Sequence, residues 1–285
     1  MNTLKRINWL ASYPKSGNTW VRCFLRAYQF DAYEPIDINR IGRISKSDSR
    51  QSWFEELLAE DGTELTDEVV NSLRYQVQKR LATEIGEHQV AKTHNARVIV
   101  DGTPLIQEGF TRRVVYVVRN PLDVVDSLAD HTGTSIDEAI QSMNDSHYCF
   151  GGMDRKFVRQ YLTTWSNHVI SWTQNITYPL LVLRYEDLLA NPVENFRNLI
   201  RFLGWMYDED RVNRSIRFSS FESLKASETA GSFEEVSDAS TSGTFFRRGK
   251  AEAWSATLSA DQIAQVRTDH ETVMRQLGYI CTDSP

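Results

Sequence analysis

The strongest constraint on the fold of this chain is a series of short, continuous apolar runs that each precede a helical pattern. One such run is VVYVV within Arg112–Val118, after which Asn120 and Pro121 supply an N-cap and a first-turn proline for a helix. The other runs are Ile7–Ser12, Val90–Thr93 and Tyr178–Tyr185. Apolar strands without alternation are typical of parallel sheets covered on both faces. We therefore predict an α/β fold in which helices flank a parallel β-sheet on both faces.

The chain has 285 residues, of which 41% are hydrophobic, and this is enough for one large domain with a buried core. No repeat, linker or change of composition divides the sequence, so we expect a single domain over residues 1–285. Polar segments at about 31–87, 132–157 and 226–244 interrupt the pattern of strands and helices. We interpret them as insertions that cap a substrate site, because ligand contacts often lie on loops carried by a rigid sheet.

The charge balance limits the classes of partner. Lys and Arg number 32 and Asp and Glu number 38, which gives a net charge of −6, without any block of like charges. Binding to nucleic acids or anionic membranes needs a net basic surface, so we expect neither partner. The sequence shows no signal h-region and no apolar stretch of membrane-spanning length. The odd set Cys23, Cys149 and Cys281 is typical of buried thiols in a reducing compartment, and we expect a cytoplasmic protein.

The loop after the first strand has the composition of a phosphate-binding site. It reads YPKSGNTW over residues 13–20 and leads into a helical pattern over Thr19–Phe30. Gly17 permits a close turn, Lys15 brings a mobile charge, and the short polar side chains are Ser16, Asn18 and Thr19. Such a loop presents backbone N–H groups and the positive end of a helix to an anion. It is not a Walker A loop, because Trp9 and Pro14 stand where that motif needs glycine.

A second anion site is indicated at the end of the strand over 112–118. Arg119 follows this strand, and Ser127 lies eight residues further on, about two turns along the next helix. A guanidinium and a hydroxyl at the carboxyl end of a parallel strand can bind a phosphate together. Considered alone, an arginine after a strand more often forms a surface ion pair.

Together these motifs resemble those of the cytosolic-type sulfotransferase family. The matching segments are the loop Tyr13–Trp20, the KTH motif Lys92–His94, the pair Arg119 and Ser127, and Phe245–Trp254, which is similar to the family's RKGxxGDWK segment. The departures are Asn18, where threonine or alanine is usual, and Glu252 and Ala253, where the family has Gly and Asp. The resemblance implies a P-loop-like sheet and 3′-phosphoadenosine 5′-phosphosulfate (PAPS) as the sulfuryl donor, with 3′-phosphoadenosine 5′-phosphate (PAP) as the product.

The resemblance also implies roles for individual residues. Lys15 would contact the bridging oxygen of the leaving phosphate, His94 would take the acceptor proton, and Lys92 would stabilise the transferring group. The implied 5′-phosphosulfate ligands are Ser16, Gly17, Asn18 and Thr19; the implied 3′-phosphate ligands are Arg119, Ser127, Arg247, Arg248 and Gly249; and the implied adenine contacts are Trp20, Tyr185 and Phe221.

A histidine suits the role of base, because its ordinary pKa of about 6.5 leaves a neutral nitrogen at cellular pH. We expect the other histidines to be structural or at the surface; these are His88, His131, His147, His168 and His270. No HExxH motif, paired Cys or His ligands, or EF-hand loop occurs, so we expect no metal. We interpret Glu186 and Asp187 as ordinary acidic residues at a helix start.

We therefore predict an enzyme, a PAPS-dependent sulfotransferase acting on a hydroxyl of a small molecule, with an amine as the alternative acceptor. Because YPKSGNTWVRC also resembles bacterial sulfotransferases of natural products, the leading hypothesis for the acceptor is a secondary metabolite. Aromatic residues that could line its pocket are Trp53, Tyr148, Phe150 and Phe157.

Two other functions stay open at this point, and so does the oligomeric state. A metal-dependent nucleotide or small-molecule kinase could use a related sheet, and a non-catalytic protein could retain the nucleotide site. The family's dimer motif KxxxTVxxxE is present only in part: Thr272 and Val273 match, whereas Thr268 and Leu277 replace the flanking Lys and Glu. A homodimer is compatible with the sequence.

Overall fold

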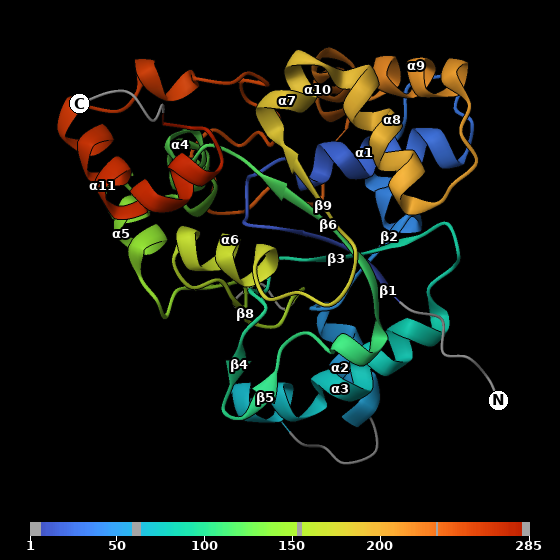
Figure 1. The fold of residues 1–285 in the computed structure, drawn as a ribbon, viewed down its shortest axis with the longest axis horizontal. Coiled ribbons are helices and arrows are strands. Elements are labelled where there is room, and N and C mark those ends of the chain that lie inside the picture. Colours follow the sequence, from blue (N-terminus) through green and yellow to red (C-terminus); the bar gives the residue numbers. More distant parts are fainter. Residues whose placement is uncertain (1–6, 59–63, 153–155, 232, 281–285) are drawn as a thin grey trace.

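The central sheet has five strands, all paired in parallel (Figure 1). The computed structural model describes residues 7–58, 64–152, 156–231 and 233–280. The strand order is β2–β3–β1–β6–β9, with bounds Ser45–Ser47, Val90–Thr93, Ile7–Ser12, Thr111–Val118 and Leu180–Arg184 respectively. This arrangement confirms the predicted parallel sheet and all four strands expected from the apolar runs.

Both faces of the sheet are buried, because neighbouring residues along each strand point to opposite sides. Leu10 packs with α1 (Asn18–Gln29) and α8 (Pro192–Leu203) in one apolar core. Trp9 packs in a second core with α4 (Pro121–Thr132), α6 (Trp165–Thr173) and α11 (Ala260–Gln276). Figure 1 shows these two groups of helices on opposite sides of the sheet, as predicted.

The helix boundaries follow the predicted capping signals closely. Asn120 caps α4 by accepting a hydrogen bond from the backbone N–H of Leu122 at 3.1 Å, and Pro121 is the first helical residue. Helix α1 begins at Asn18, one residue before the predicted start, because Gly17 takes a left-handed conformation and forms the N-cap. The third predicted strand is shorter than expected at both ends, since Tyr185 already begins α7 (Tyr185–Ala190).

The polar segment 31–87 contains more regular structure than expected. Besides the 3-10 helix η1 (Ile38–Arg43) and the helices α2 (Gln51–Leu58) and α3 (Asp67–Glu84), it supplies the edge strand β2. The sequence of β2 is SKS, which has no apolar run, so its strand conformation depends on pairing with β3 rather than on its own pattern.

The other elements surround this framework. They are η2 (Glu108–Phe110), α5 (Ile136–Asn144), α9 (Glu209–Phe218), α10 (Phe221–Ala230), η3 (Ala253–Ala256) and two short antiparallel pairs, β4 (Ile99–Val100) with β5 (Thr103–Pro104) and β7 (Cys149–Phe150) with β8 (Gln160–Tyr161). None of the helices in the described ranges combines the length and the apolar character that crossing a membrane requires.

The cysteines behave differently from one another. Cys23 is a free, fully buried thiol in an apolar cluster beside α1, as predicted. Cys149 is also free, but it is only half-buried, so the prediction of a buried thiol is wrong at this position. It lies in the short strand β7, outside the main cores. Cys281 lies outside the described residues.

The core between α1 and α8 offers a test of the packing. Phe196 of α8 is fully buried, and its ring stacks on Phe24 of α1 with a centroid distance of 3.8 Å. We expect Phe196→Ala to lower the free energy of unfolding by about 3–5 kcal/mol, through lost burial and the cavity left behind. Urea unfolding followed by tryptophan fluorescence measures this loss.

The matched control is Phe30→Ala, since Phe30 is 51% exposed at the end of α1. Its unfolding free energy should change by no more than about 0.5 kcal/mol. Equal effects of the two substitutions would contradict the described packing.

Candidate active site

One cavity of about 640 Å³ lies at the edge of the sheet where the parallel strands end. Lys15 lies in the loop after β1, and His94, Arg119 and Tyr185 directly follow β3, β6 and β9. Because parallel strands deliver their next residues to the same edge, these four side chains meet at one place. All four line the cavity.

The structure brings nearly all of the predicted site residues to this cavity. Those that line it are Lys15, Gly17, Asn18, Thr19, Trp20, Lys92, His94, Arg119, Ser127, Tyr185, Phe221, Arg247, Arg248 and Gly249. Ser16 is the exception among the predicted residues. Its side chain is fully buried beneath the loop, and its hydroxyl has no hydrogen-bond partner among the described residues.

The loop after β1 presents the N-terminus of α1 to the cavity. Gly17 caps this helix without a side-chain hydrogen bond, and the first turn contains no acidic residue. Its φ of +105° is strained for other residues, and a Cβ there would lie 2.7 Å from Cδ2 of Tyr185. Only glycine therefore lets the ring of Tyr185 pack against this turn. The uncapped N-terminus can attract an anion through its backbone N–H groups.

The polar side chains of this loop bind to other parts of the protein. The side-chain amide of Asn18 donates to the carbonyl of Leu10 and to the hydroxyl of Ser12, both at 3.2 Å. The hydroxyl of Thr19 donates to Glu235 at 2.9 Å. The Asn18 amide therefore holds the loop against β1, and the proton of the Thr19 hydroxyl is directed at a carboxylate.

Two lysines supply positive charge in the cavity. Burial lowers the pKa of Lys15 and of Lys92 to about 8, although Glu235 opposes this shift in both cases. The Lys15 ammonium lies 3.9 Å from the ring centroid of Phe245, and that of Lys92 lies 5.2 Å from the centroid of Phe157. These poorly solvated ammonium groups would gain more from an anionic ligand than exposed lysines would.

His94 has one ring nitrogen fixed by the backbone. Its Nδ1 lies 2.8 Å from the carbonyl oxygen of Ser12, and since a carbonyl only accepts, Nδ1 carries the hydrogen in this bond. In the neutral imidazole the other nitrogen, Nε2, then has a free lone pair. Burial, with Lys92 adding to the effect, holds the pKa of His94 well below 6.5, so the ring is neutral at pH 7. His94 can accept a proton at Nε2.

A buried network fixes the backbone around His94. Nε2 of His168 donates to the carbonyl of His94 at 3.0 Å, while Nδ1 of His168 is 2.8 Å from the hydroxyl of Tyr116. The indole N–H of Trp172 donates to the carbonyl of Asn95 at 3.0 Å. As expected, His168 is structural, and its hydrogen bond to the carbonyl of His94 fixes the backbone of the candidate base.

Arg119 lies at the other end of the cavity, against an aromatic ring. Its guanidinium is 4.4 Å from the ring centroid of Tyr185, and it donates to the carbonyls of Lys15 and Lys250 at 3.4 and 3.1 Å. It thereby connects the first loop with the segment around Lys250. In contrast with the alternative of a surface ion pair, no described carboxylate pairs with Arg119 in the salt bridges of the structure.

The segment after Arg248 covers this end of the cavity. Gly249 has a φ of +60°, and a Cβ there would lie 2.1 Å from the ring of Phe221, so the ring packs directly on the backbone. Asp123 accepts hydrogen bonds from the backbone N–H groups of Glu252 and Trp254 at 2.9 and 3.1 Å. Glu252, where the family has Gly, takes a left-handed conformation with a φ of +58°. The loop therefore keeps a turn that favours glycine.

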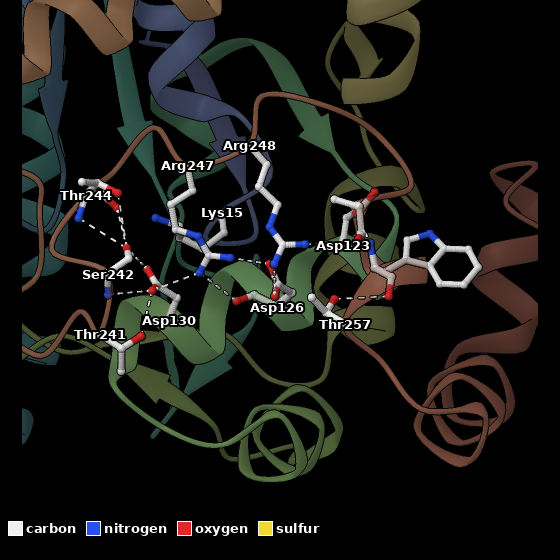
Figure 2. Close-up of polar contacts among 12 residues, drawn as sticks. Lys15, Asp123, Asp126, Asp130, Thr241, Ser242, Thr244, Arg247, Arg248 and Thr257 are labelled. Carbon is white, nitrogen blue, oxygen red and sulfur yellow. Dashed lines mark hydrogen bonds and ion pairs between the residues drawn. The ribbon is translucent and has the colours of Figure 1, made fainter.

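Two acidic residues of α4 hold the predicted phosphate-binding arginines (Figure 2). Arg247 forms ion pairs with Asp126 at 2.5 Å and with Asp130 at 3.1 Å. Arg248 forms an ion pair with Asp126 at 3.2 Å. Neither aspartate was predicted from the sequence, although Asp126 and Asp130 are four residues apart on the predicted helix after Arg119 and therefore lie on one face of it.

Two further residues of the cavity, Glu235 and His131, were not predicted from the sequence as site residues. Glu235 lines the cavity, and its carboxylate accepts hydrogen bonds from the hydroxyl of Thr19 and, at 2.6 Å, from the guanidinium of Arg22. Burial alone would raise the pKa of Glu235, but the positive charges of Arg22 and Lys92 have the larger effect and lower it to about 2. No sequence pattern distinguishes Glu235 within its polar segment.

His131, which we expected to be structural or at the surface, lines the cavity and stacks on Phe150 with a distance of 5.6 Å between the ring centroids. Glu186, as expected, has a structural role and accepts from the backbone N–H of Asn120.

Aromatic side chains line part of the cavity, and one of them, Phe157, lies near Lys92. Tyr148, Phe150 and Phe157 line the cavity, whereas Trp53 packs in the core instead. The segments 132–157 and 226–244 both contribute residues to the lining of the cavity. The described residues between 31 and 87 contribute none, because this segment builds the sheet edge and the helices α2 and α3.

Comparison with known proteins agrees with this geometry. The family model described as "Sulfotransferase domain" matches residues 6–278. The dog protein "Sulfotransferase 1A1" is 25% identical over 275 residues, which cover 94% of this chain and 83% of the dog protein. The zebrafish "Cytosolic sulfotransferase 1" is 28% identical over 264 residues, 90% of this chain and 78% of its own length.

The fold also matches a solved structure of retinol dehydratase in a complex with retinol and PAP. The TM-score is 0.62 at 18% sequence identity, and the match covers 100% of this chain and 84% of the other. At this identity the likeness concerns the fold. Since the family model spans nearly the whole sequence, the chain belongs to the sulfotransferase-domain family.

Proposed function

We propose that the protein transfers a sulfuryl group from PAPS to a hydroxyl of a small-molecule acceptor. The observation that carries this proposal is the meeting of His94, with Nε2 free to accept a proton, and two poorly solvated lysines in one cavity. Membership of the sulfotransferase-domain family and the PAP held by the retinol dehydratase of like fold support PAPS as the donor.

The residues of the cavity fit the two anionic ends of PAPS. The uncapped N-terminus of α1, with Lys15, would hold the 5′-phosphosulfate. The 3′-phosphate would be held by Arg119, Ser127, Arg247 and Arg248, which line the same cavity. Tyr185 and Phe221, whose rings pack on Gly17 and Gly249, offer flat apolar surfaces for adenine.

PAPS, when bound, supplies a sulfuryl group that is linked to its 5′-phosphate through a bridging oxygen. His94 accepts the proton of the acceptor hydroxyl at Nε2 as the acceptor oxygen bonds to sulfur and the bond from sulfur to the bridging oxygen breaks. Lys15 stabilises the negative charge that the leaving phosphate gains, and Lys92 stabilises the transferring group. The remaining residues position the two reactants.

The aromatic lining favours a flat or apolar acceptor. Tyr148, Phe150, Phe157 and His131 line the same cavity as His94, and burial, with Lys15 adding to it, lowers the pKa of His131 to about 3. His131 is therefore neutral and cannot pair with an anionic acceptor.

A hydroxyl of a secondary metabolite stays our hypothesis for the acceptor group, with an amine as the alternative. We further propose one domain acting in the cytoplasm; a homodimer stays a prediction.

Nucleotide binding tests the donor and separates the enzyme from a kinase. We expect PAP at saturating concentration, in the presence of EDTA, to raise the melting temperature of the protein by several degrees, since a ligand bound only to the folded state stabilises it. ATP with Mg²⁺ should raise it less. A larger shift with magnesium-bound ATP than with PAP would favour the kinase alternative.

Substitution of the two central residues tests the chemistry. We expect His94→Ala and Lys15→Ala each to lower turnover at least about 100-fold, because each removes a group that acts in the transition state. Transfer of labelled sulfate from PAPS to a panel of metabolites measures the rate. His94→Ala should retain PAP binding, which shows that it is folded.

The matched control is His147→Ala, because His147 is exposed and does not line the cavity. It should retain the wild-type rate. If His94→Ala were as active as this control on the same acceptor, the proposed base would be wrong.

The lowered lysine pKa values predict how binding depends on pH. An anion favours the charged ammonium, so each lysine with a pKa of about 8 becomes protonated as PAP binds above that pH. The phosphates, with a second pKa of about 6, stay ionised over this range. PAP affinity should therefore fall between pH 7 and 9, with proton uptake that calorimetry detects by comparing two buffers.

Lys15→Arg separates the two lysines, because arginine stays charged throughout this range. Its proton uptake at pH 9 should be smaller than that of the wild type. A PAP affinity that is constant from pH 7 to 9 would contradict the lowered pKa values.

A further inference from the structure

The helix α4 carries three aspartates toward the segment that crosses the nucleotide end of the cavity. Asp123, Asp126 and Asp130 are spaced by three and four residues, so they lie on one face of the helix. Figure 2 shows all three directed at the segment 241–257. The side chains of Asp126 and Asp130 are only 12% and 10% exposed, although both are charged partners of arginine.

Asp126 connects the two arginines. One of its oxygens accepts from Nη2 of Arg247 at 2.5 Å, and the other accepts from Nη2 of Arg248 at 3.2 Å. Arg248 is also held by the carbonyl of Ala253, which accepts from Nη1 at 3.0 Å. A single carboxylate thus fixes both guanidinium groups relative to α4.

Asp130 holds Arg247 and the chain that precedes it. Besides its ion pair with Arg247, its carboxylate accepts from the hydroxyl of Thr241 at 2.8 Å and from the backbone N–H and hydroxyl of Ser242 at 2.9 and 3.0 Å. These bonds outweigh the effect of burial and lower the pKa of Asp130. The segment that carries the two arginines is therefore bound to α4 on both sides, by Asp130 at residues 241–242 and by Asp123 at residues 252 and 254.

These contacts leave part of each guanidinium for a ligand. A guanidinium has five N–H donors, and the contacts of Arg247 involve its two terminal nitrogens, each of which carries two hydrogens. Arg247 and Arg248 both line the cavity, and so does Ser127, the neighbour of Asp126 on α4. The arginines that the carboxylates hold therefore line the same cavity as Ser127, whose hydroxyl the family resemblance assigns to the same phosphate.

We propose that Asp126 and Asp130 are positioning residues for the nucleotide: they hold Arg247 and Arg248 in place to receive its 3′-phosphate. The proposal rests on the proposed function, since it presupposes a 3′-phosphorylated nucleotide in this cavity. Because the two arginine side chains are already ordered, nucleotide binding does not have to include the cost of their conformational entropy. The two carboxylates also compensate the charge of Arg247 and Arg248, whereas Lys15, Lys92 and Arg119 form no ion pair with a described carboxylate.

The direction in which a single substitution changes the affinity for PAP tests this role. By charge alone, removing a carboxylate from an anion-binding cavity would tighten the binding of PAP. If Asp126 positions the arginines, Asp126→Asn should instead raise the dissociation constant of PAP by about tenfold or more, as expected for loss of a hydrogen bond between charged groups. Adenosine 5′-monophosphate, which lacks the 3′-phosphate, should lose less than about threefold, so that the preference for PAP declines.

A matched control separates charge from position. Asp238 lines the same cavity and forms none of the ion pairs with Arg247 or Arg248. Asp238→Asn should leave PAP binding unchanged or tighter. Asp126→Glu, which keeps the carboxylate, should restore part of the preference for PAP, and a wild-type melting temperature of each variant shows that it is folded.

A double-mutant cycle shows whether Asp126 acts through Arg247. Asp126→Asn should weaken PAP binding less in the Arg247→Gln background than in the wild type, because one of the two arginines that Asp126 holds is then absent. With PAPS as substrate, Asp126→Asn should raise the KM for PAPS and leave kcat at saturation nearly unchanged.

Two outcomes would overturn the inference: a PAP dissociation constant that is unchanged or lower in Asp126→Asn, or additive effects in the cycle. These differ from failure of the proposed function, which would show in the wild-type protein as absent PAP binding.

Discussion

The parallel pairing of β3, β1, β6 and β9 is the constraint on which the rest of the site depends. Each pair is held in register by the ladder, so the residue that follows each strand arrives at the same edge. No single segment contains the site: the loop of Lys15, the imidazole of His94 and the guanidinium of Arg119 come from three strand ends. A substitution that unpaired one strand would therefore separate groups that lie up to 104 residues apart in the sequence.

Burial determines the electrostatics of this edge. The two lysines and His94 line one cavity, and desolvation by burial is the largest cause of the lowered pKa of all three. The same effect that weakens the lysines as cations keeps the imidazole neutral and ready to accept a proton. An anionic ligand would restore the lysines to their charged state, so binding and protonation are linked in this site.

Much of this arrangement could be predicted from the sequence, because local patterns encode it. The apolar run before Arg119 and the cap formed by Asn120 identify a strand and a helix without reference to the rest of the chain. The edge strand β2 could not be predicted, since its three polar residues become a strand only beside β3. Glu235 was missed for a similar reason: its partners Thr19 and Arg22 are more than two hundred residues away, and only the folded chain brings them together.

The contact of Tyr185 with Gly17 has a consequence for how this site can change. The ring of Tyr185 contacts both the backbone of Gly17 and the guanidinium of Arg119. These three groups come from three different strand ends, and the ring is the contact that the other two share. A substitution that changes the size of this ring would therefore alter the surroundings of the first loop and of Arg119 at the same time, so the two anion-binding ends of the cavity are coupled through one side chain.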